Sequence, residues 1–432
     1  MRVLITGAYG LIGAAVLARL RRDGHELVGA GRSLSDARRR FPYAQWIAAD
    51  FTRLLTAEAW RPLLARIDAV VNCVGVLQTG ARDDARRVHV EGTCALFAAC
   101  AQAGVRRVIH ISATGAAAAG PTEFSRTKAE AEACLSRLDL DWLILRPGLV
   151  LAPNVHGGSA ILRGIAGCPL ALPVTAPDSE ILVVSVEDIA ETAALVLRPG
   201  APARATWEVA HPTPHMLGDI VRSIRAWLGF PPRPVVHLPA FAATAVSRAA
   251  DALGWLGWRS PARTTAMAQL RAGMSGDPKP WMAATGIKPK SLDDILAAAP
   301  ATVQDRWHAR LFFIKPLAIA TLAAFWIVTG IVSLGPGWNE AVALLSPAGW
   351  PSWLVGLVVV AGALLDIVLG AALLVRPLAR PVLITMFLVC IPYLLAATWI
   401  NPALWLDPLG RLTKTIPVML AILFTLAILD ER

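Results

Sequence analysis

The sequence of 432 residues has few charged residues, six cysteines and three tyrosines. Charged residues make up 17% of the chain, against roughly 25% in soluble domains, which indicates that part of it avoids water. The cysteines form no Cys-x-x-Cys pair and lie near no group of histidines, which argues against a zinc site or a disulfide framework. We therefore expect no metal, and buried thiols in a reducing compartment.

Acidic residues are fewer than basic ones, and the net charge is +10. A nucleic-acid-binding protein would carry its basic residues clustered on one face. Here the arginines, such as Arg38–Arg40, Arg86 and Arg87, are scattered along the chain before the apolar C-terminal part. We predict no nucleic-acid partner, and instead a basic surface that faces anionic lipid.

Long apolar runs are confined to the part of the chain after Phe312. The expected spans are about 314–334, 353–375, 382–400 and 414–429. The first three approach the roughly 20 residues that cross the hydrocarbon of a bilayer, and the fourth is shorter and weaker. The sequence therefore predicts a bundle of four transmembrane helices, with the lipid bilayer as a partner.

The positions of Lys and Arg around these runs predict the topology. Three basic residues precede the first run, the loop 335–352 has none, and Arg376 and Arg380 separate the second and third runs. Arg411 and Lys414 go against the rule at the last run. We expect an integral protein, in a bacterial inner membrane, with its N-terminal domain in the cytoplasm.

Short apolar runs alternate with helical stretches in the first part of the chain. The expected strands are 3–6, 26–30, 46–49, 69–73, 107–111 and 143–145, with a first helix at 11–22. This alternation predicts an α/β fold, a Rossmann doubly wound parallel sheet. The expected domains are the Rossmann domain 1–150, a small substrate lobe 151–300 that completes it, and the transmembrane bundle 301–432.

The strongest motif is the glycine-rich turn that follows the first strand and opens the first helix. Its residues are Thr6, Gly7, Tyr9, Gly10, Leu11, Ile12 and Gly13. The glycines permit a tight turn, a close approach of the backbone to a pyrophosphate, and close packing of helix on strand. The free amides of the helix then face the negative charge. This context predicts a dinucleotide site.

The ends of the next strands complete this site. An acidic residue after the second strand would bind the ribose 2′-hydroxyl of NAD, whereas the sequence has Arg32 and Ser33, which suit the 2′-phosphate of NADP. We favour NADP, with NAD as the alternative. Two further groups follow the third and fourth strands: Asp50 and Phe51 for the adenine, and Asn72, Val74 and Gly75 where the nicotinamide-side ribose passes.

These motifs together resemble the short-chain dehydrogenase/reductase superfamily in its extended or atypical branch. Arg146-Pro147-Gly148 with Val150, and the stretch 183–189, resemble two of its downstream segments. The whole is most similar to NmrA-like and complex I accessory-subunit-like members. The C-terminal bundle resembles DoxX-like membrane domains.

The resemblance fails at the catalytic tyrosine. Active members carry a Tyr four residues before a Lys, and here Lys128 is present but Phe124 takes the Tyr position. The family implies that Lys128 holds the nicotinamide ribose and that Ser112, or Thr114, binds the substrate oxygen. Phe124 cannot transfer a proton, so a contribution of about 10²–10⁴-fold is lost unless another group replaces it.

Asp366 lies in the middle of the second apolar run, where a charge is costly and marks a functional site as the default hypothesis. It is either a proton-linked or quinone-linked site, with Tyr393 or Thr385 as neighbours, or a carboxyl used only for helix packing.

Two functions remain open on this sequence. The first is an NADP-dependent oxidoreductase acting on a small apolar carbonyl or a quinone. The second is a non-catalytic NAD(P)H sensor or assembly factor, which Phe124 favours. An epimerase or dehydratase would need the missing Tyr. The sequence allows a homo-oligomer.

Overall fold

The protein is known from a computed structural model that describes residues 1–81, 83–155 and 157–430. The chain divides into two compact units. The first contains residues 1–254 and 260–309, and the second contains 255–259 and the chain from Arg310 onward. The short segment 255–259 therefore leaves the first unit between two of its helices and packs with the C-terminal helices.

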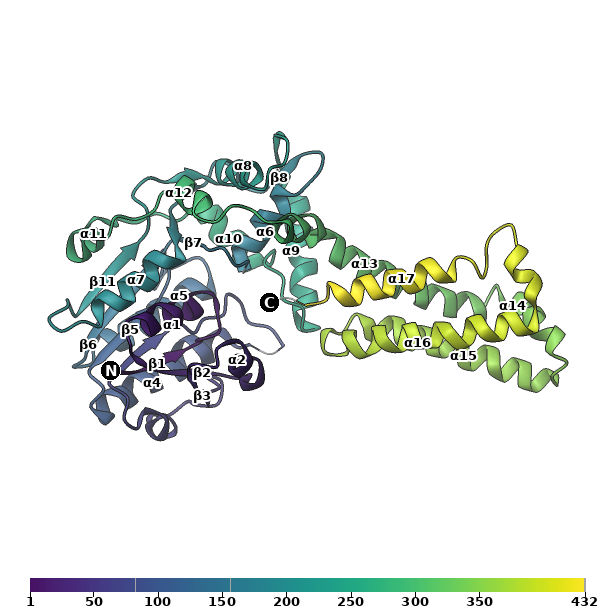
Figure 1. The fold of residues 1–432 in the computed structure, drawn as a ribbon, viewed down its shortest axis with the longest axis horizontal. Helices are drawn as coiled ribbons and strands as arrows, with labels where there is room; N and C mark the ends of the chain where they lie inside the picture. The colour runs from purple at the N-terminus through teal and green to yellow at the C-terminus, as the bar shows by residue number, and fades with distance from the viewer. Residues whose placement is uncertain (82, 156, 431–432) are drawn as a thin grey trace. The chain divides into compact units, whose positions relative to one another are not determined.

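The first unit is built on a seven-stranded parallel sheet (Figure 1). Its strands are β1 (Arg2–Thr6), β2 (Glu26–Gly31), β3 (Gln45–Ala48), β4 (Ala69–Asn72), β5 (Arg107–Ile111), β6 (Asp141–Pro147) and β11 (Ala205–Val209), in the order β11-β6-β5-β4-β1-β2-β3. The predicted α/β Rossmann fold is confirmed. β11, which pairs with β6, is the one strand of this sheet that the sequence analysis did not predict.

Both faces of the sheet are buried, which explains why its strands read as continuous apolar runs. Alternate residues point to opposite faces. Val3 and Ile5 join one apolar cluster, with helix α1 (Leu11–Arg22) and helix α7 (Val186–Val196) over it. Leu4, between them, joins the other cluster.

The second cluster lies under helices on the opposite face of the sheet, chiefly α4 (Gly92–Ala103) and α5 (Glu123–Ser136). The remaining helical segments of this layered part are α2 (Leu34–Arg40), α3 (Ala57–Trp60), η1 (Arg61–Leu64) and the π-helical turn η2 (Arg87–Glu91). Because each strand ends at the same edge of the sheet, the loops after β1, β2, β4 and β5 meet there.

A smaller lobe follows β6 and has its own apolar core. Its strands form three pairs: β7 (Leu149–Leu151) with β10 (Val183–Ser185), β8 (Leu172–Val174) with β13 (Val235–His237), and β9 (Glu180–Ile181) with β12 (His215–Met216). Its helices are α6 (Gly157–Ala166), α8 (Leu217–Trp227), α9 (Ala240–Trp255), α10 (Thr264–Ala272) and α12 (Leu292–Ala297). Helix α11 (Lys279–Thr285) instead packs against the main sheet, where Trp281 joins the first apolar cluster.

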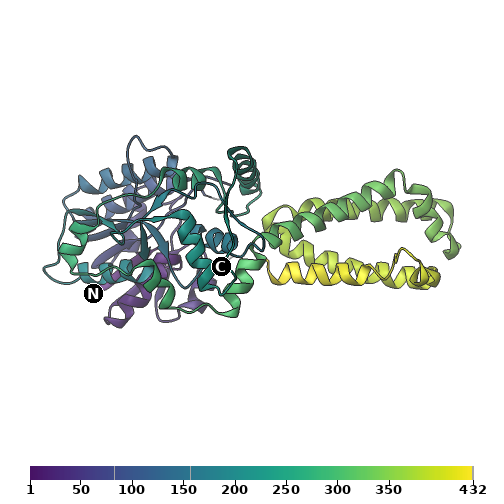
Figure 2. The same cartoon turned by 90° about the horizontal axis from the view of Figure 1, so that it is seen from above.

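The second unit is helical. Its elements are α13 (Val303–Leu334) from Arg310 onward, α14 (Trp338–Leu345), η3 (Ser346–Ala348), α15 (Ser352–Leu373), α16 (Arg376–Ile400), η4 (Pro402–Leu406) and α17 (Thr415–Ala427). Figure 2 shows the long helices of this unit running lengthwise beside one another. By length and composition, α13, α15 and α16 are long and apolar enough to cross a membrane, whereas α17 has 13 residues. The first of these helices begins at Val303, before the predicted apolar run.

Candidate functional site

The glycine-rich turn after β1 has the geometry of a phosphate-binding loop. Gly7 has a φ of +64°, and its carbonyl accepts a hydrogen bond from the Gly10 amide at 2.9 Å. A Cβ at Gly13 would lie 2.2 Å from the Gly7 oxygen, and one at Gly7 would lie 2.9 Å from the Cys73 oxygen. Gly10 caps α1 without any side-chain cap, so the first amides of α1, those of Leu11 and Ile12 among them, are left for an anion.

Tyr9 extends from this turn to the end of β2. Its ring occupies the space beside Gly31, where a Cβ would lie 2.2 Å from the ring. Its hydroxyl accepts the backbone N–H groups of Arg32 and Ser33 at 3.0 and 3.4 Å. The glycine-rich turn and the end of β2, where we expect the adenine-side ribose of the cofactor, are thus brought together.

Arg32 has an ionic partner that the sequence did not indicate. Its Nη1 lies 2.8 Å from Oδ1 of Asp83, in the loop that follows β4. The Arg32 side chain is 41% exposed and that of Asp83 is 18% exposed. A carboxylate of the protein itself is therefore bound by the guanidinium that we expect to bind a 2′-phosphate. The 50 residues between the two positions hold no local pattern that predicts this pair.

Thr6 and Asn72 are buried and bind each other across the neighbouring ends of β1 and β4. The Thr6 hydroxyl donates to Oδ1 of Asn72 at 2.6 Å, and the amide of Val74 donates to the same oxygen at 3.2 Å. The Asn72 amide contacts Nδ1 of His110 on β5 at 3.1 Å. These side chains hold the strand ends in place below the site, so their effect on a cofactor would be indirect.

Lys128, on α5, lies beside the loop that follows β4. Its ammonium is buried and donates to the Ile111 carbonyl at 2.9 Å. A Cβ at Gly75 would lie 3.4 Å from Nζ of Lys128, so the ammonium lies close to the backbone of Gly75. Burial lowers the pKa of Lys128 to about 8, against an opposing effect of Glu132.

His89 is a site residue that sequence reasoning missed. Its ring meets the Phe124 ring edge-to-face, with 5.6 Å between centroids. Nε2 accepts the Val76 amide at 2.9 Å, and Nδ1 lies 2.9 Å from the Thr127 hydroxyl, which itself donates to the Glu123 carbonyl. These partners assign a neutral ring protonated at Nδ1.

Burial, and then the charge on Lys128, lower the pKa of His89 well below its usual range. The histidine therefore fixes the loop after β4 and does not replace the phenol that Phe124 lacks. Its only signal in the sequence is a single His between Val88 and Val90, flanked by charged residues.

Ser112 and Thr114, after β5, are held by a buried charge network. The Ser112 hydroxyl donates to Glu132, and Glu132 binds Arg146 through two hydrogen bonds of 2.5 and 3.0 Å. Arg146 also pairs with Glu208 of β11 at 3.3 Å, and Thr114 donates to Glu208 at 2.9 Å. The unpredicted strand β11 thus supplies one carboxylate of the site.

Asp50 and Phe51 follow β3 as expected. Oδ1 of Asp50 accepts the amide and the hydroxyl of Thr52 at 3.0 and 2.8 Å, which forms a local turn. Phe51 is buried, with its ring 4.9 Å from that of Trp60. The structure therefore places Phe51 in the core and Asp50 at the rim of the site.

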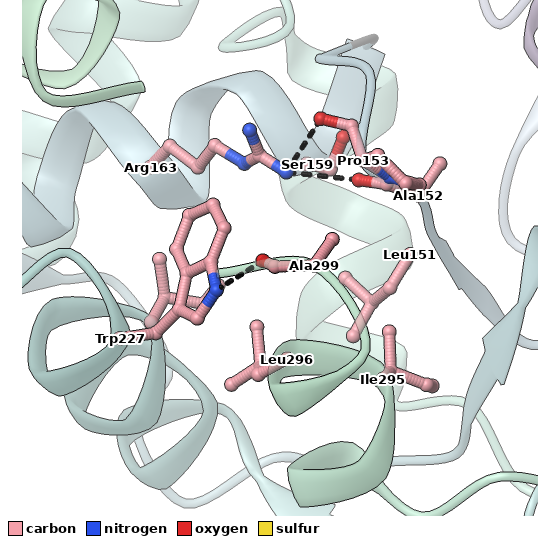
Figure 3. Close-up of a pocket in the computed structure, with 10 residues that line it drawn as sticks. Leu151, Ala152, Pro153, Ser159, Arg163, Trp227, Ile295, Leu296 and Ala299 are labelled. Atoms are coloured by element: carbon pink, nitrogen blue, oxygen red, sulfur yellow. Dashed lines mark hydrogen bonds between the residues drawn. The ribbon is translucent and has the colours of Figure 1, made fainter. Parts of the chain in front are cut away.

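Residues of the lobe line at least two hollows among the described residues. One is a cavity of about 20 Å³ beside Arg163 and Trp227, with room for one water molecule (Figure 3). The Arg163 guanidinium there is tied to Asp305 at 2.7 Å and to the carbonyls of Ala152 and Pro153. The other is an open groove of about 710 Å³, lined among others by Pro177, Glu180, His237, Arg271 and Met274.

In the second unit, Asp366 lies on α15 and is 8% exposed. The Tyr393 hydroxyl of α16 reaches α15 one turn away, 3.1 Å from the position of a Cβ at Gly362. Thr385, the other expected neighbour, is exposed on α16.

Comparison with known proteins identifies both parts of the chain. Residues 7–197 match the NAD(P)H-binding family, and residues 323–423 match the DoxX-like family. The chain therefore combines an NAD(P)H-binding domain, built on a Rossmann-like parallel sheet, with a C-terminal DoxX-like domain. The DoxX-like domain and its apolar helices indicate association with a membrane.

The individual relatives are distant. A 3-diazoavenalumate denitrifying reductase from Streptomyces is 31% identical over 40% of this chain and 64% of the reductase. The photosystem II assembly factor Ycf39 of Synechocystis is 25% identical over 48% of this chain and 62% of that factor. The first curated relatives that match are uncharacterized mycobacterial proteins at 29% identity, and the chain spans 19% of their length.

Among solved structures, the Bordetella bronchiseptica enzyme WbmG in complex with NAD aligns with a TM-score of 0.52. It is 19% identical and covers 69% of this chain and 92% of WbmG. At this identity the likeness establishes the fold alone.

Proposed function

We propose that the protein is an NADPH-dependent oxidoreductase, anchored in a bacterial inner membrane with the N-terminal unit in the cytoplasm. Its substrate would be an apolar carbonyl compound or a quinone drawn from the bilayer. The observation that carries this proposal is the buried ammonium of Lys128, beside Gly75 and at the same edge of the sheet as the glycine-rich turn.

The residues present fit a nicotinamide dinucleotide. The amides at the start of α1 suit a pyrophosphate, and no Cβ at Gly7 or Gly13 obstructs the turn. Arg32 would pair with the 2′-phosphate of NADP after exchanging Asp83 for it. The bound cofactor would supply the hydride.

The chain's own residues would position the reactants. Lys128 would hold the hydroxyls of the nicotinamide-side ribose, because its ammonium is directed to this end of the sheet by the Ile111 carbonyl. Phe124 gives an apolar wall beside His89 in place of an acid. With a pKa of about 8, Lys128 is the group near Gly75 whose proton could be released near neutral pH.

The lobe would contribute the substrate side. The groove of about 710 Å³ falls within the range of ligand sites in size. The chain continues from this groove to Gly276, where a Cβ would lie 2.8 Å from Glu208. One end of the groove therefore lies next to Glu208, which belongs to the charge network that holds Ser112 and Thr114.

A second function is favoured by one observation, the replacement of the proton donor by Phe124. The chain would then be a non-catalytic NAD(P)H sensor or assembly factor. The relative Ycf39, named as an assembly factor, supports this alternative.

The test is NADPH oxidation by the purified full chain with a panel of quinones and carbonyl compounds. The oxidoreductase proposal predicts turnover in the wild type, a loss of at least about tenfold in Lys128→Ala, and no loss in Lys279→Ala, which removes an exposed lysine. Tight NADPH binding without turnover, with activity gained in Phe124→Tyr, would instead establish the sensor.

A further inference from the structure

Helices α13 and α15 of the second unit approach each other closely at two points. The section of the helix pair between these points is called one level. A Cβ at Gly330 of α13 would lie 2.4 Å from the Ala363 carbonyl of α15. A Cβ at Gly370 of α15 would lie 2.8 Å from the Ala323 carbonyl of α13. The two helices therefore run antiparallel and nearly touch at two points, where glycine is the residue that the space permits.

Trp326 and Asp366 both lie between these two contacts. Trp326 falls between Ala323 and Gly330 on α13, and Asp366 falls between Ala363 and Gly370 on α15. The two side chains are 4% and 8% exposed. An aromatic N–H donor and a carboxyl acceptor are thus enclosed at the same level of one helix pair.

Each of the two side chains has a buried polar atom without a hydrogen bond to any described residue. Among the described residues, Nε1 of Trp326 and Oδ1 of Asp366 have no hydrogen-bond partner. A buried polar group without a partner is costly, and hydrocarbon offers no water to replace one. Two such groups at one level indicate a partner that comes from outside the chain.

α16 covers this level with a mixed surface. Cys390 and Met386 are buried in the same cluster as Trp326. The hydroxyl of Tyr393, one turn further along α16, lies 3.1 Å from the position of a Cβ at Gly362, one turn from Asp366 on α15. The surroundings are therefore aromatic and apolar, with hydrogen-bonding groups of both kinds, as in many sites for small neutral ligands.

We propose that Trp326 and Asp366 form a binding site for a lipid-soluble phenol, a class that includes the hydroquinone form of membrane quinones. A phenolic hydroxyl satisfies both groups at once, because it donates to Oδ1 of Asp366 and accepts from the indole N–H of Trp326. A quinone carbonyl or an ether can only accept, and leaves Oδ1 of Asp366 without a donor. The inference uses the membrane location proposed above and is independent of NADPH chemistry.

The test compares two redox-inert probes that differ in one hydrogen, a long-chain 4-alkylphenol and its methyl ether. Binding of each is measured by equilibrium dialysis to the full chain in detergent, without nicotinamide cofactor. Wild-type protein should bind the phenol at least about tenfold more tightly than the ether, because the ether cannot donate to Oδ1 of Asp366 and leaves this buried oxygen without a partner.

Variants then assign the preference to the two residues. In Asp366→Leu, which removes the unsatisfied carboxyl, the preference should fall to about twofold or less. In Trp326→Phe, both probes should bind several-fold more weakly. Two variants serve as controls. Trp399→Phe removes an indole that is 80% exposed, and Asp407→Asn removes an acid that pairs with Arg411 away from Trp326 and Asp366. Both variants should bind the two probes as the wild type does.

Two outcomes would overturn the site: equal binding of phenol and ether by the wild type, or an unchanged preference in Asp366→Leu. Failure of the proposed function has a different signature. A protein that binds the phenol with the predicted preference but never oxidises NADPH would retain this site and lose the oxidoreductase assignment.

Discussion

Asp83 should act as an internal competitor of the 2′-phosphate of NADP, and Asp83→Asn should therefore increase the affinity for NADPH. In the structure, Nη1 of Arg32 and Oδ1 of Asp83 are 2.8 Å apart. NADPH would have to displace this carboxylate before its phosphate could pair with Arg32, whereas NADH has no phosphate to place there.

The size of the effect follows from the exposure of the pair. The Arg32 side chain is 41% exposed, so solvent screens the interaction, and it is worth about 1 kcal/mol at most. The removal of Asp83 should therefore tighten NADPH binding about fivefold, since 1.4 kcal/mol corresponds to tenfold. The affinity for NADH should change by less than about twofold.

The assay is a calorimetric titration of the full chain with NADPH and NADH at fixed, low ionic strength, because salt weakens the interaction. Asp139→Asn is the matched control: it makes the same charge change just before β6, at the opposite edge of the sheet. An unchanged or weaker NADPH affinity in Asp83→Asn, or an equal gain for NADH, would refute the role given to this pair.

Three further predictions concern the rest of the site. Gly13→Ala should abolish dinucleotide binding, because its Cβ would lie 2.2 Å from the Gly7 oxygen, whereas Gly158→Ala, with its nearest neighbour at 3.8 Å, should bind normally in the same titration. Glu132→Gln should lower the free energy of unfolding by about 3 kcal/mol in denaturant melts, since it leaves Arg146 with one carboxylate fewer, and Glu130→Gln, at the surface, should change it by under about 0.5 kcal/mol. Lys128 has a pKa of about 8 in the folded protein, below its unfolded value, so the unfolded state binds the extra proton between the two values and stability should rise with pH from about 8 to about 10. Thermal melts should show that rise in the wild type and a flatter profile in Lys128→Met.

The choice between an oxidoreductase and a sensor depends chiefly on position 124, four residues before Lys128. In the structure, Phe124 contacts His89, and His89 is held neutral by Val76 and Thr127. A restored phenol at position 124 would therefore face a fixed ring next to a buried ammonium. The rate of NADPH oxidation by Phe124→Tyr would therefore measure whether the other residues of the site can support catalysis once the phenol is present.

Local patterns determined the class of fold and the position of the dinucleotide site. The spacing of Gly7, Gly10 and Gly13 reflects contacts within one turn and the first helix, so it can be read from adjacent residues. The apolar strands and the C-terminal apolar runs are also local, because burial on both faces or in lipid requires uninterrupted apolar residues.

Pairs that are distant in the sequence were decided by the tertiary structure. Arg32 meets Asp83, Ser112 meets Glu132, and Trp326 lies level with Asp366 only after the sheet and the helices have packed. β11 was missed for the same reason, since a short edge strand is specified by its pairing with β6 and not by its own residues. The type of each element thus depends on near neighbours, whereas the partner of each charged group depends on chain segments that only folding brings together.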